Sequence, residues 1–197
     1  MKGARTRVST YTSSWFGLGN PLPGDFESIA TTTVGAGGVA EIDFTSIPST
    51  YKHLQVRALV RTNRASTRDG LYIYVNNDRT TTSYTTHQLI GNGGGVGTSG
   101  GYGSGSGVGA QSGPLVGNSP TSEIFSVFIM DILDYADTNK NTTIRMFGGW
   151  DGNGFGDVFL NSNAFLSNAA VDRIGFDPVN GTGFIEYSQF ALYGIKG

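Results

Sequence analysis

The alternation of apolar and polar side chains over short segments is the feature that most constrains how this chain folds. In "YKHLQVRALVR" (51–61), the two kinds of side chain fall on opposite sides of an extended backbone. A period of two residues is typical of a half-buried β-strand, and no segment of useful length has the period of a helix. The apolar side is formed by Leu54, Val56, Ala58 and Val60, and the polar side by His53, Gln55, Arg57 and Arg61.

Segments of this kind follow one another from Phe26 to the end of the chain, separated by turn residues. Most are rich in β-branched and aromatic residues, which favour strands. Nine or ten antiparallel strands in residues 26–197 predict an all-β domain, an antiparallel two-sheet sandwich of jelly-roll type. Its predicted core consists of Leu54, Val56, Val60, Ile73, Phe128, Met130 and Ile132.

Residues 1–25 differ from this domain, because their glycines and prolines break any regular element. They predict an extended N-terminal arm. Its large apolar side chains favour docking on a neighbouring protein over a frayed terminus, and its basic side chains would meet an acidic patch there. Folding of the arm back onto its own sandwich is the alternative. The expected partner-binding residues are Lys2, Arg5, Arg7, Trp15, Phe16 and Leu18.

A glycine-rich stretch interrupts the series of strands at residues 91–113, where 12 of 23 residues are glycine. Such a composition is typical of flexible linkers, because glycine loses much backbone freedom on ordering. Its place inside a β domain instead predicts a long, uncharged insertion loop whose small side chains allow close approach. Packing within the subunit and packing against a neighbour both remain open.

The segment "EIFSVFIMDIL" (123–133) is apolar on both sides, although a sandwich strand needs only one apolar face. The core side is formed by Ile124, Phe128, Met130 and Ile132. The glycine-rich loop, the arm or another subunit could cover the second side. We expect a homo-oligomer, preferably a trimer, whose interface includes Phe125, Val127, Ile129 and Leu133.

Composition excludes several kinds of site and partner. The chain has 197 residues, no cysteine and two histidines, which excludes disulfides and argues against a Cys/His zinc site. Its net charge of −2 provides no basic field for nucleic acid. No apolar run suits a signal peptide or a membrane span, so we expect a protein made and soluble in a cytoplasm. No cofactor is expected.

Candidate catalytic groups are few. His53 and His87 are isolated in the sequence and are interpreted as surface histidines. Paired carboxylates suit a glycosidase, but such pairs are frequent by chance, and we expect no enzymatic activity. The two pairs are Asp131 with Asp134 and Glu41 with Asp43.

Three further features have an ordinary alternative explanation. "DTNKN" (137–141) begins like a calcium loop but has Gly148 in place of the bidentate Glu, and "DGNGFGD" (151–157) has Phe at its fifth position. Both are interpreted as turns. Tyr72 and Tyr74 point away from the apolar side of their strand, which makes them the best candidates for a sugar-stacking platform.

Three blocks of the sequence resemble a widespread group of small virion proteins of tailed bacteriophages. They are "ESIATTTVGAGGVAEIDFTSIPSTYKHLQVRALVRT" (27–62), "DILDYADTNKNTTIR" (131–145) and "QFALYGIKG" (189–197). The arm and the glycine-rich stretch lie outside this resemblance, and none of the blocks holds a catalytic motif. Members of the group are structural components of the head or the tail.

The resemblance implies a structural protein of the virion, synthesised in the host cytoplasm. Together with the arm, it favours a capsid decoration or cement protein that binds the major capsid protein, or another virion protein, and stabilises the head lattice. The alternative is a tail fibre or baseplate module that binds a host-surface glycan. Neither nucleic acid nor a membrane is expected as a partner.

Overall fold

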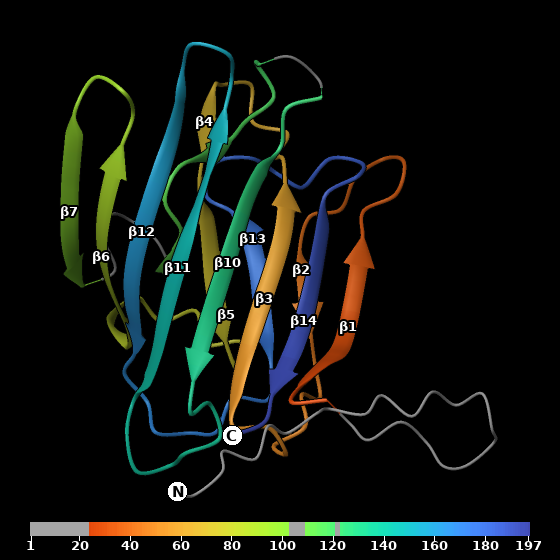
Figure 1. The fold of residues 1–197 in the computed structure, drawn as a ribbon, viewed down its shortest axis with the longest axis vertical. Coiled ribbons are helices and arrows are strands. Elements are labelled where there is room, and N and C mark those ends of the chain that lie inside the picture. Colours follow the sequence, from red (N-terminus) through yellow and green to blue (C-terminus); the bar gives the residue numbers. More distant parts are fainter. Residues whose placement is uncertain (1–23, 103–108, 121–122) are drawn as a thin grey trace, which may run out of the picture.

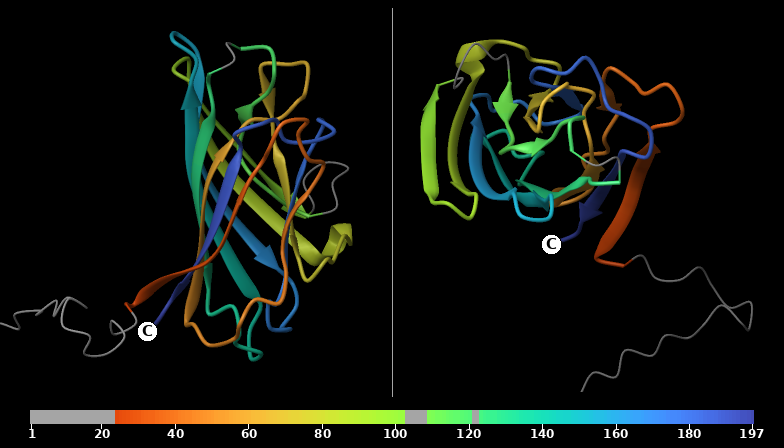
Figure 2. Two further views of the ribbon diagram at one scale, coloured as in Figure 1. Left: turned by 90° about the vertical axis from the view of Figure 1, so that its right-hand side faces the viewer. Right: turned by 90° about the horizontal axis from the view of Figure 1, so that it is seen from above.

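The strands form two stacked antiparallel sheets. The computed structural model describes residues 24–102, 109–120 and 123–197, and these contain strands and one short 3-10 turn, Thr81–Ser83, but no α-helix. Figure 1 shows the larger sheet in front of the smaller one, and Figure 2 shows the two layers from the side and from above. The all-β antiparallel sandwich is therefore confirmed, whereas its jelly-roll detail is not.

The larger sheet has eight strands in the order β1-β14-β3-β10-β11-β12-β6-β7. In that order they span Phe26–Thr33, Gln189–Ile195, His53–Val60, Ser126–Leu133, Thr142–Asp151, Gly156–Phe165, Tyr84–Gly91 and Val96–Tyr102. The smaller sheet has the order β2-β13-β5-β8, and its strands span Ile42–Phe44, Ile174–Pro178, Leu71–Val75 and Ala110–Gln111. A separate pair is formed by β4 (Arg68–Asp69) and β9 (Leu115–Val116).

The core lies between the two sheets. The ring of Phe128 on β10 packs against Phe176 of the smaller sheet and against Phe190 of β14, with ring centroids 6.4 Å and 6.2 Å apart. Burial of such side chains is the main stabilising contribution in a sandwich. The seven residues predicted to form the core are all buried, and they are Leu54, Val56, Val60, Ile73, Phe128, Met130 and Ile132.

The glycine-rich stretch is not simply a loop. Val96–Tyr102 forms β7, the edge strand beside β6, and residues 110–111 form β8 in the smaller sheet. Close packing explains two glycines: a Cβ on Gly113 would lie 2.1 Å from Cγ of Phe159, and one on Gly109 would lie 3.0 Å from the Tyr74 ring. Backbone pairing needs no side chain, so the loop prediction was wrong for these segments.

Arg61, which the alternation assigned to the polar side of its strand, is buried just beyond the end of β3. Its guanidinium donates hydrogen bonds to the carbonyl oxygens of Ile124, at 3.0 Å, and Pro120, at 2.6 Å. The chain that leads into β10 therefore covers this end of the sheet, and carbonyl oxygens replace the water around Arg61.

Candidate functional site: the apolar outer face of the larger sheet

The outer face of the larger sheet, which points away from the smaller sheet, carries two parallel rows of apolar side chains. In the first row, Leu59 of β3 lies beside Val127 of β10, and Gly149 of β11 separates Val127 from Val158 of β12. The second row consists of Ile129, Phe147, Leu160 and Leu89, which come from β10, β11, β12 and β6. We term these two rows the apolar outer face.

The side chains of the apolar outer face are open to solvent. Phe147 is 58% exposed, Val158 55% and Val127 53%, and the other apolar side chains of the two rows are also exposed. Isolated exposed apolar residues are ordinary on soluble proteins, but a contiguous patch marks a binding surface. Because the register places these residues beside one another across five strands, the patch is contiguous.

A groove of about 660 Å³ opens at one end of this face. Val127, Phe147 and Val158 line it on the sheet together with Gly149, whose lack of a side chain lets the β12 backbone approach: a Cβ there would lie 2.4 Å from the carbonyl oxygen of Asp157. Phe155, from the turn between β11 and β12, contributes a further aromatic wall. The groove is thus lined mainly by apolar and aromatic groups, as binding sites for apolar ligands are.

Interactions behind the groove hold its aromatic wall in place. The Trp150 and Phe155 rings meet edge to face, with centroids 5.5 Å apart. The indole nitrogen of Trp150 donates a hydrogen bond to Oδ2 of the buried Asp157, at 3.1 Å, and Arg68 forms an ion pair with the same oxygen. These contacts preorganise the wall, which lowers the entropic cost of binding.

A row of polar side chains borders the apolar outer face further along the strands. Asp131 of β10 and Arg145 of β11 are direct cross-strand neighbours in this row. Asp131 accepts a hydrogen bond from Nε2 of Gln55, at 2.8 Å. Arg145 is exposed, and within the part of the chain that the structure describes it forms no ion pair. The row thus offers one basic side chain, Arg145, to an outside partner.

Arg57 interrupts the second apolar row on the β3 side, but its charged group is turned toward the sheet edge. Its guanidinium carbon lies 5.1 Å from the Phe26 ring centroid and 5.6 Å from that of Tyr193. Such cation–π contacts hold the guanidinium over the two rings and away from β10.

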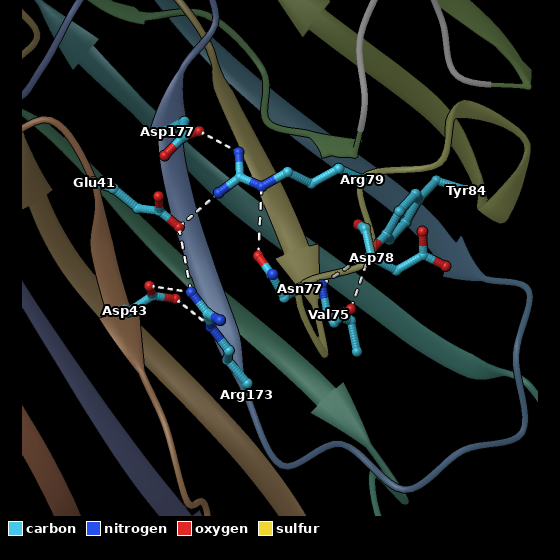
Figure 3. A network of polar contacts seen from close by, with 9 residues as sticks. All are labelled: Glu41, Asp43, Val75, Asn77, Asp78, Arg79, Tyr84, Arg173 and Asp177. Carbon is cyan, nitrogen blue, oxygen red and sulfur yellow. Dashed lines mark hydrogen bonds and ion pairs between the residues drawn. The ribbon is translucent and has the colours of Figure 1, made fainter.

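The outer face of the smaller sheet is charged instead. Figure 3 shows Arg79 between Asp177 and Glu41, whose carboxylate oxygens each lie 2.7 Å from a guanidinium nitrogen. Arg173 forms a two-pronged ion pair with Asp43 and lies 3.8 Å from Glu41. Burial, with Asp177 and Asp43 nearby, raises the pKa of Glu41. The carboxylate pair Glu41 and Asp43 does share a face, as predicted, and arginines occupy it.

Of the two candidates for a sugar-stacking platform, Tyr72 and Tyr74, the structure buries Tyr74. Its side chain points away from the core, as expected, but it is only 2% exposed. The Arg79 guanidinium lies 3.8 Å above the ring, and Gly109 leaves room for the ring beside it. A neighbouring arginine therefore takes the place that a sugar would need.

The remaining catalytic candidates lie in ordinary surroundings. His53 accepts a hydrogen bond at Nδ1 from the backbone N–H of Asp134, at 3.0 Å, and His87 is exposed on the outer face of the larger sheet. Lys140 and Lys52 form ion pairs with Asp134 and lower its pKa to about 2. Asp131 and Asp134 have different partners, because Asp131 accepts a hydrogen bond from Gln55 whereas Asp134 forms an ion pair with Lys140.

Both calcium-like motifs are turns. Asp137 accepts a hydrogen bond from the backbone N–H of Asn139, at 2.9 Å, and Asp151 accepts one from that of Asn153, at 2.8 Å. These are the Asx-type contacts by which such residues stabilise turns. Among the residues that the structure describes, no group of three or more His, Cys, Asp or Glu is placed to hold a metal ion.

The structure also locates the predicted interface residues. Val127, Ile129 and Leu133 are exposed on the outer face, as the two-sided pattern predicted, and Phe125 is half-buried just before β10. The predicted arm residues lie outside the described residues, and they are Lys2, Arg5, Arg7, Trp15, Phe16 and Leu18.

Sequence reasoning missed most of the apolar outer face. Phe147, Val158 and Leu160 belong to segments that were recognised as strands, yet they were not assigned to an interface. Each occupies a position of the alternation where a half-buried strand has a polar residue, and that departure was the available signal.

Within the described ranges, no helix is both long and apolar enough to cross a membrane. Comparison of the chain with family models, with curated proteins and with solved structures returns no match.

Proposed function

We propose that this chain is a structural component of a tailed-bacteriophage virion, a decoration or cement protein that binds and stabilises the head lattice. The observation that supports a structural role is the apolar outer face, a contiguous surface of exposed apolar side chains on neighbouring strands of one sheet. The resemblance of the three sequence blocks supports the virion, and the predicted arm supports attachment to a lattice of neighbouring subunits.

The apolar outer face suits a protein partner energetically. Covering the exposed half of one such side chain contributes about 1 kcal/mol, half of the usual value for full burial. The seven apolar side chains of the two rows together provide a contribution comparable to the entropic cost of association. A partner that adds polar contacts at the rim then binds stably.

The arm provides a second attachment in this proposal. Trp15, Phe16 and Leu18 anchor it on the major capsid protein or another virion protein, and Lys2, Arg5 and Arg7 meet acidic groups there. Several weak contacts on one lattice act together, because each bound segment raises the effective concentration of the next.

Immunogold electron microscopy of purified virions of the phage or prophage that encodes the chain tests this function. Gold distributed over the head supports a decoration protein. Virions without the chain, as judged by gold and by mass spectrometry of purified particles, contradict any virion role. Matched particles from which the gene is deleted serve as the control and are expected to lose heads on heating or at low salt.

A tail module that binds a host-surface glycan is the second candidate. The groove favours it, because Phe155 stands at its wall and Asn92 and Asp151 contribute polar groups to its lining. Aromatic rings with nearby amide and carboxylate groups suit a sugar. Gold confined to the tail tip, together with a lower affinity for host glycans in Phe155→Ala, distinguishes this function from head decoration.

A further inference from the structure

The first row of the apolar outer face, which runs from β3 to β12, is centred on the middle of its sheet. In the order β1-β14-β3-β10-β11-β12-β6-β7, four strands lie on each side of the junction between β10 and β11. Val127, Ile129 and Asp131 face outward on one side of this junction, opposite Gly149, Phe147 and Arg145 on the other. The three pairs are complementary: a branched side chain opposite a glycine, two apolar groups, and two opposite charges.

We propose that a second copy of this chain covers the apolar outer face, related to the first by a two-fold axis that runs along the strands between β10 and β11. This inference rests on the proposed function of that face as a protein-binding surface, and it names the partner. The axis places β10 of each copy over β11 of the other. The three complementary pairs within one sheet then recur, twice each, between the two copies.

The charged pair is the feature that selects a second copy over an unrelated protein. Asp131 of one subunit faces the partner's Arg145, and Arg145 faces the partner's Asp131. Arg145 is exposed and forms no ion pair among the described residues, although Asp131 is its cross-strand neighbour, so its guanidinium is open to the carboxylate of the partner's Asp131. Complementary charges at the border of an apolar interface fix its register.

The apolar contacts fit the same axis. Val127 of each subunit lies over the partner's Gly149, which has no side chain to oppose it, and Ile129 packs on the partner's Phe147. Leu59 faces the partner's Val158 in the same way. Arg57, which would face an apolar residue, holds its guanidinium over Phe26 and Tyr193 and leaves the contact free.

The whole outer face of the larger sheet is large enough for a stable pair. Its six central strands, about 4.8 Å apart, and four outward rows, about 6.8 Å apart, measure about 800 Å², of which the two apolar rows across five strands make up about 330 Å². The whole area is similar to the accessible surface of about 800 Å² that each partner of a standard protein interface contributes. Two outer faces that pack directly on each other are related by a two-fold axis, whereas three sheets around a three-fold axis cover each outer face only in part. The geometry thus favours a pair over the trimer expected from the sequence.

Two charge-reversal variants, Asp131→Arg and Arg145→Asp, test the pairing in the full chain. Alone, each variant places like charges opposite one another at both border contacts, and we expect its self-association to weaken about 10-fold or more. An equimolar mixture of the two restores opposite charges at both contacts of the mixed pair. Sedimentation velocity with one variant fluorescently labelled is expected to detect that mixed pair at near wild-type affinity.

Recovery on mixing cannot come from changes within one subunit, since each variant keeps its own intramolecular neighbours. Arg173→Asp, a charge reversal on the outer face of the smaller sheet, is the matched control and is expected to pair like the wild type. Thermal unfolding verifies that each variant folds. Should a reversal unfold the chain, Asp131→Asn and Arg145→Gln remove the charges with less perturbation and are expected to weaken pairing severalfold.

Three results would overturn the pairing: a wild-type chain that stays monomeric at tens of micromolar, single variants that associate like the wild type, or a mixture no tighter than either variant alone. A three-fold mass by light scattering would overturn the two-fold axis. A monomer that still decorates virions would refute the pairing and leave the proposed function intact. A pair that is absent from virions would refute the function and leave the pairing intact.

Discussion

The outer faces of the two sheets have opposite chemistry. The smaller sheet presents Arg79 and Arg173 among three carboxylates, and each guanidinium reaches a carboxylate oxygen within 2.9 Å. The larger sheet presents two rows of exposed apolar side chains that lie beside one another across β3, β10, β11, β12 and β6. One surface pairs its arginines with carboxylates of the same chain, and the other leaves its apolar groups in water.

The two outer faces therefore differ in what an outside partner could contribute to them. Paired charges at a surface keep most of their hydration and need no outside partner. Exposed apolar rows gain free energy only when something covers them. The sandwich therefore has one outer face whose charges are paired within the chain and one whose apolar rows are exposed, and we propose that an assembly covers the second.

The largest expected effect is a difference in stability between substitutions on the core side and on the outer side of the larger sheet. Phe128→Ala, on the core side, is expected to lower the free energy of unfolding by about 3–5 kcal/mol, because it leaves a cavity beside Phe176 and Phe190. Phe147→Ala, on the outer side of the adjacent strand, is expected to change it by less than about 0.5 kcal/mol in the dilute monomer. Urea unfolding measures both. Equal losses would mean that the outer face is part of the core.

A charged substitution on the apolar outer face tests whether this face takes part in self-association, independently of how the two copies are oriented. Phe147→Glu is expected to weaken self-association about 10-fold or more, because the carboxylate would lose its hydration at the centre of the covered face. Its melting temperature as a monomer is expected to stay close to that of the wild type. Light scattering over a dilution series measures the association. Asp43→Asn, on the smaller sheet, is the control, and equal weakening there would abolish the distinction between the two faces.

Loss of the central arginine tests whether the charged face is complete within the chain. Arg79→Ala is expected to destabilise the fold by about 1 kcal/mol, since it removes two partly exposed ion pairs and uncovers the Tyr74 ring. Arg79→Lys is expected to lose less, because it keeps a charge but not the planar group. Chemical denaturation at low and high salt measures both variants. If Arg79→Ala leaves the free energy of unfolding unchanged, the ion-pair network does not stabilise the fold.

The smallest effect concerns the acid dependence of a turn. Lys140 and Lys52 hold the pKa of Asp134 at about 2, below its ordinary value of 3.8, so the ion pairs stabilise the fold above about pH 4. That stabilisation is lost as the pH falls through about 2. Asp134→Asn is expected to melt slightly below the wild type at neutral pH and together with it at pH 2. The substitution is conservative for the backbone, because Asp134 has a φ of 49°, which asparagine tolerates. A gap that persists at pH 2 would point to a cause other than ionisation.

Much of the fold was predictable from local alternation. The period of two assigned Leu54, Val56 and Met130 to the core, and the structure buries each of them. It also identified Val127 and Ile129 as a second apolar side, which the structure exposes. These predictions succeed because the side of a strand on which a residue lies depends only on its position in that strand.

The composition of the candidate site was decided by the tertiary structure. Alternation does not specify which strands become neighbours, so the alignment of Val127, Phe147 and Leu160 in adjacent rows depends on the order of β10, β11 and β12. The strand at Val96–Tyr102 was also missed, because backbone pairing with β6 requires no particular side chain. Tyr74 was placed on the correct side of its strand, but its cover by Arg79 is a contact between side chains that alternation does not encode. Sequence by itself determined which side of each strand is apolar. The tertiary structure alone decided that the outward apolar side chains lie together on one face. Strand pairing brings them together, and it depends on backbone hydrogen bonds that all residues except proline can form.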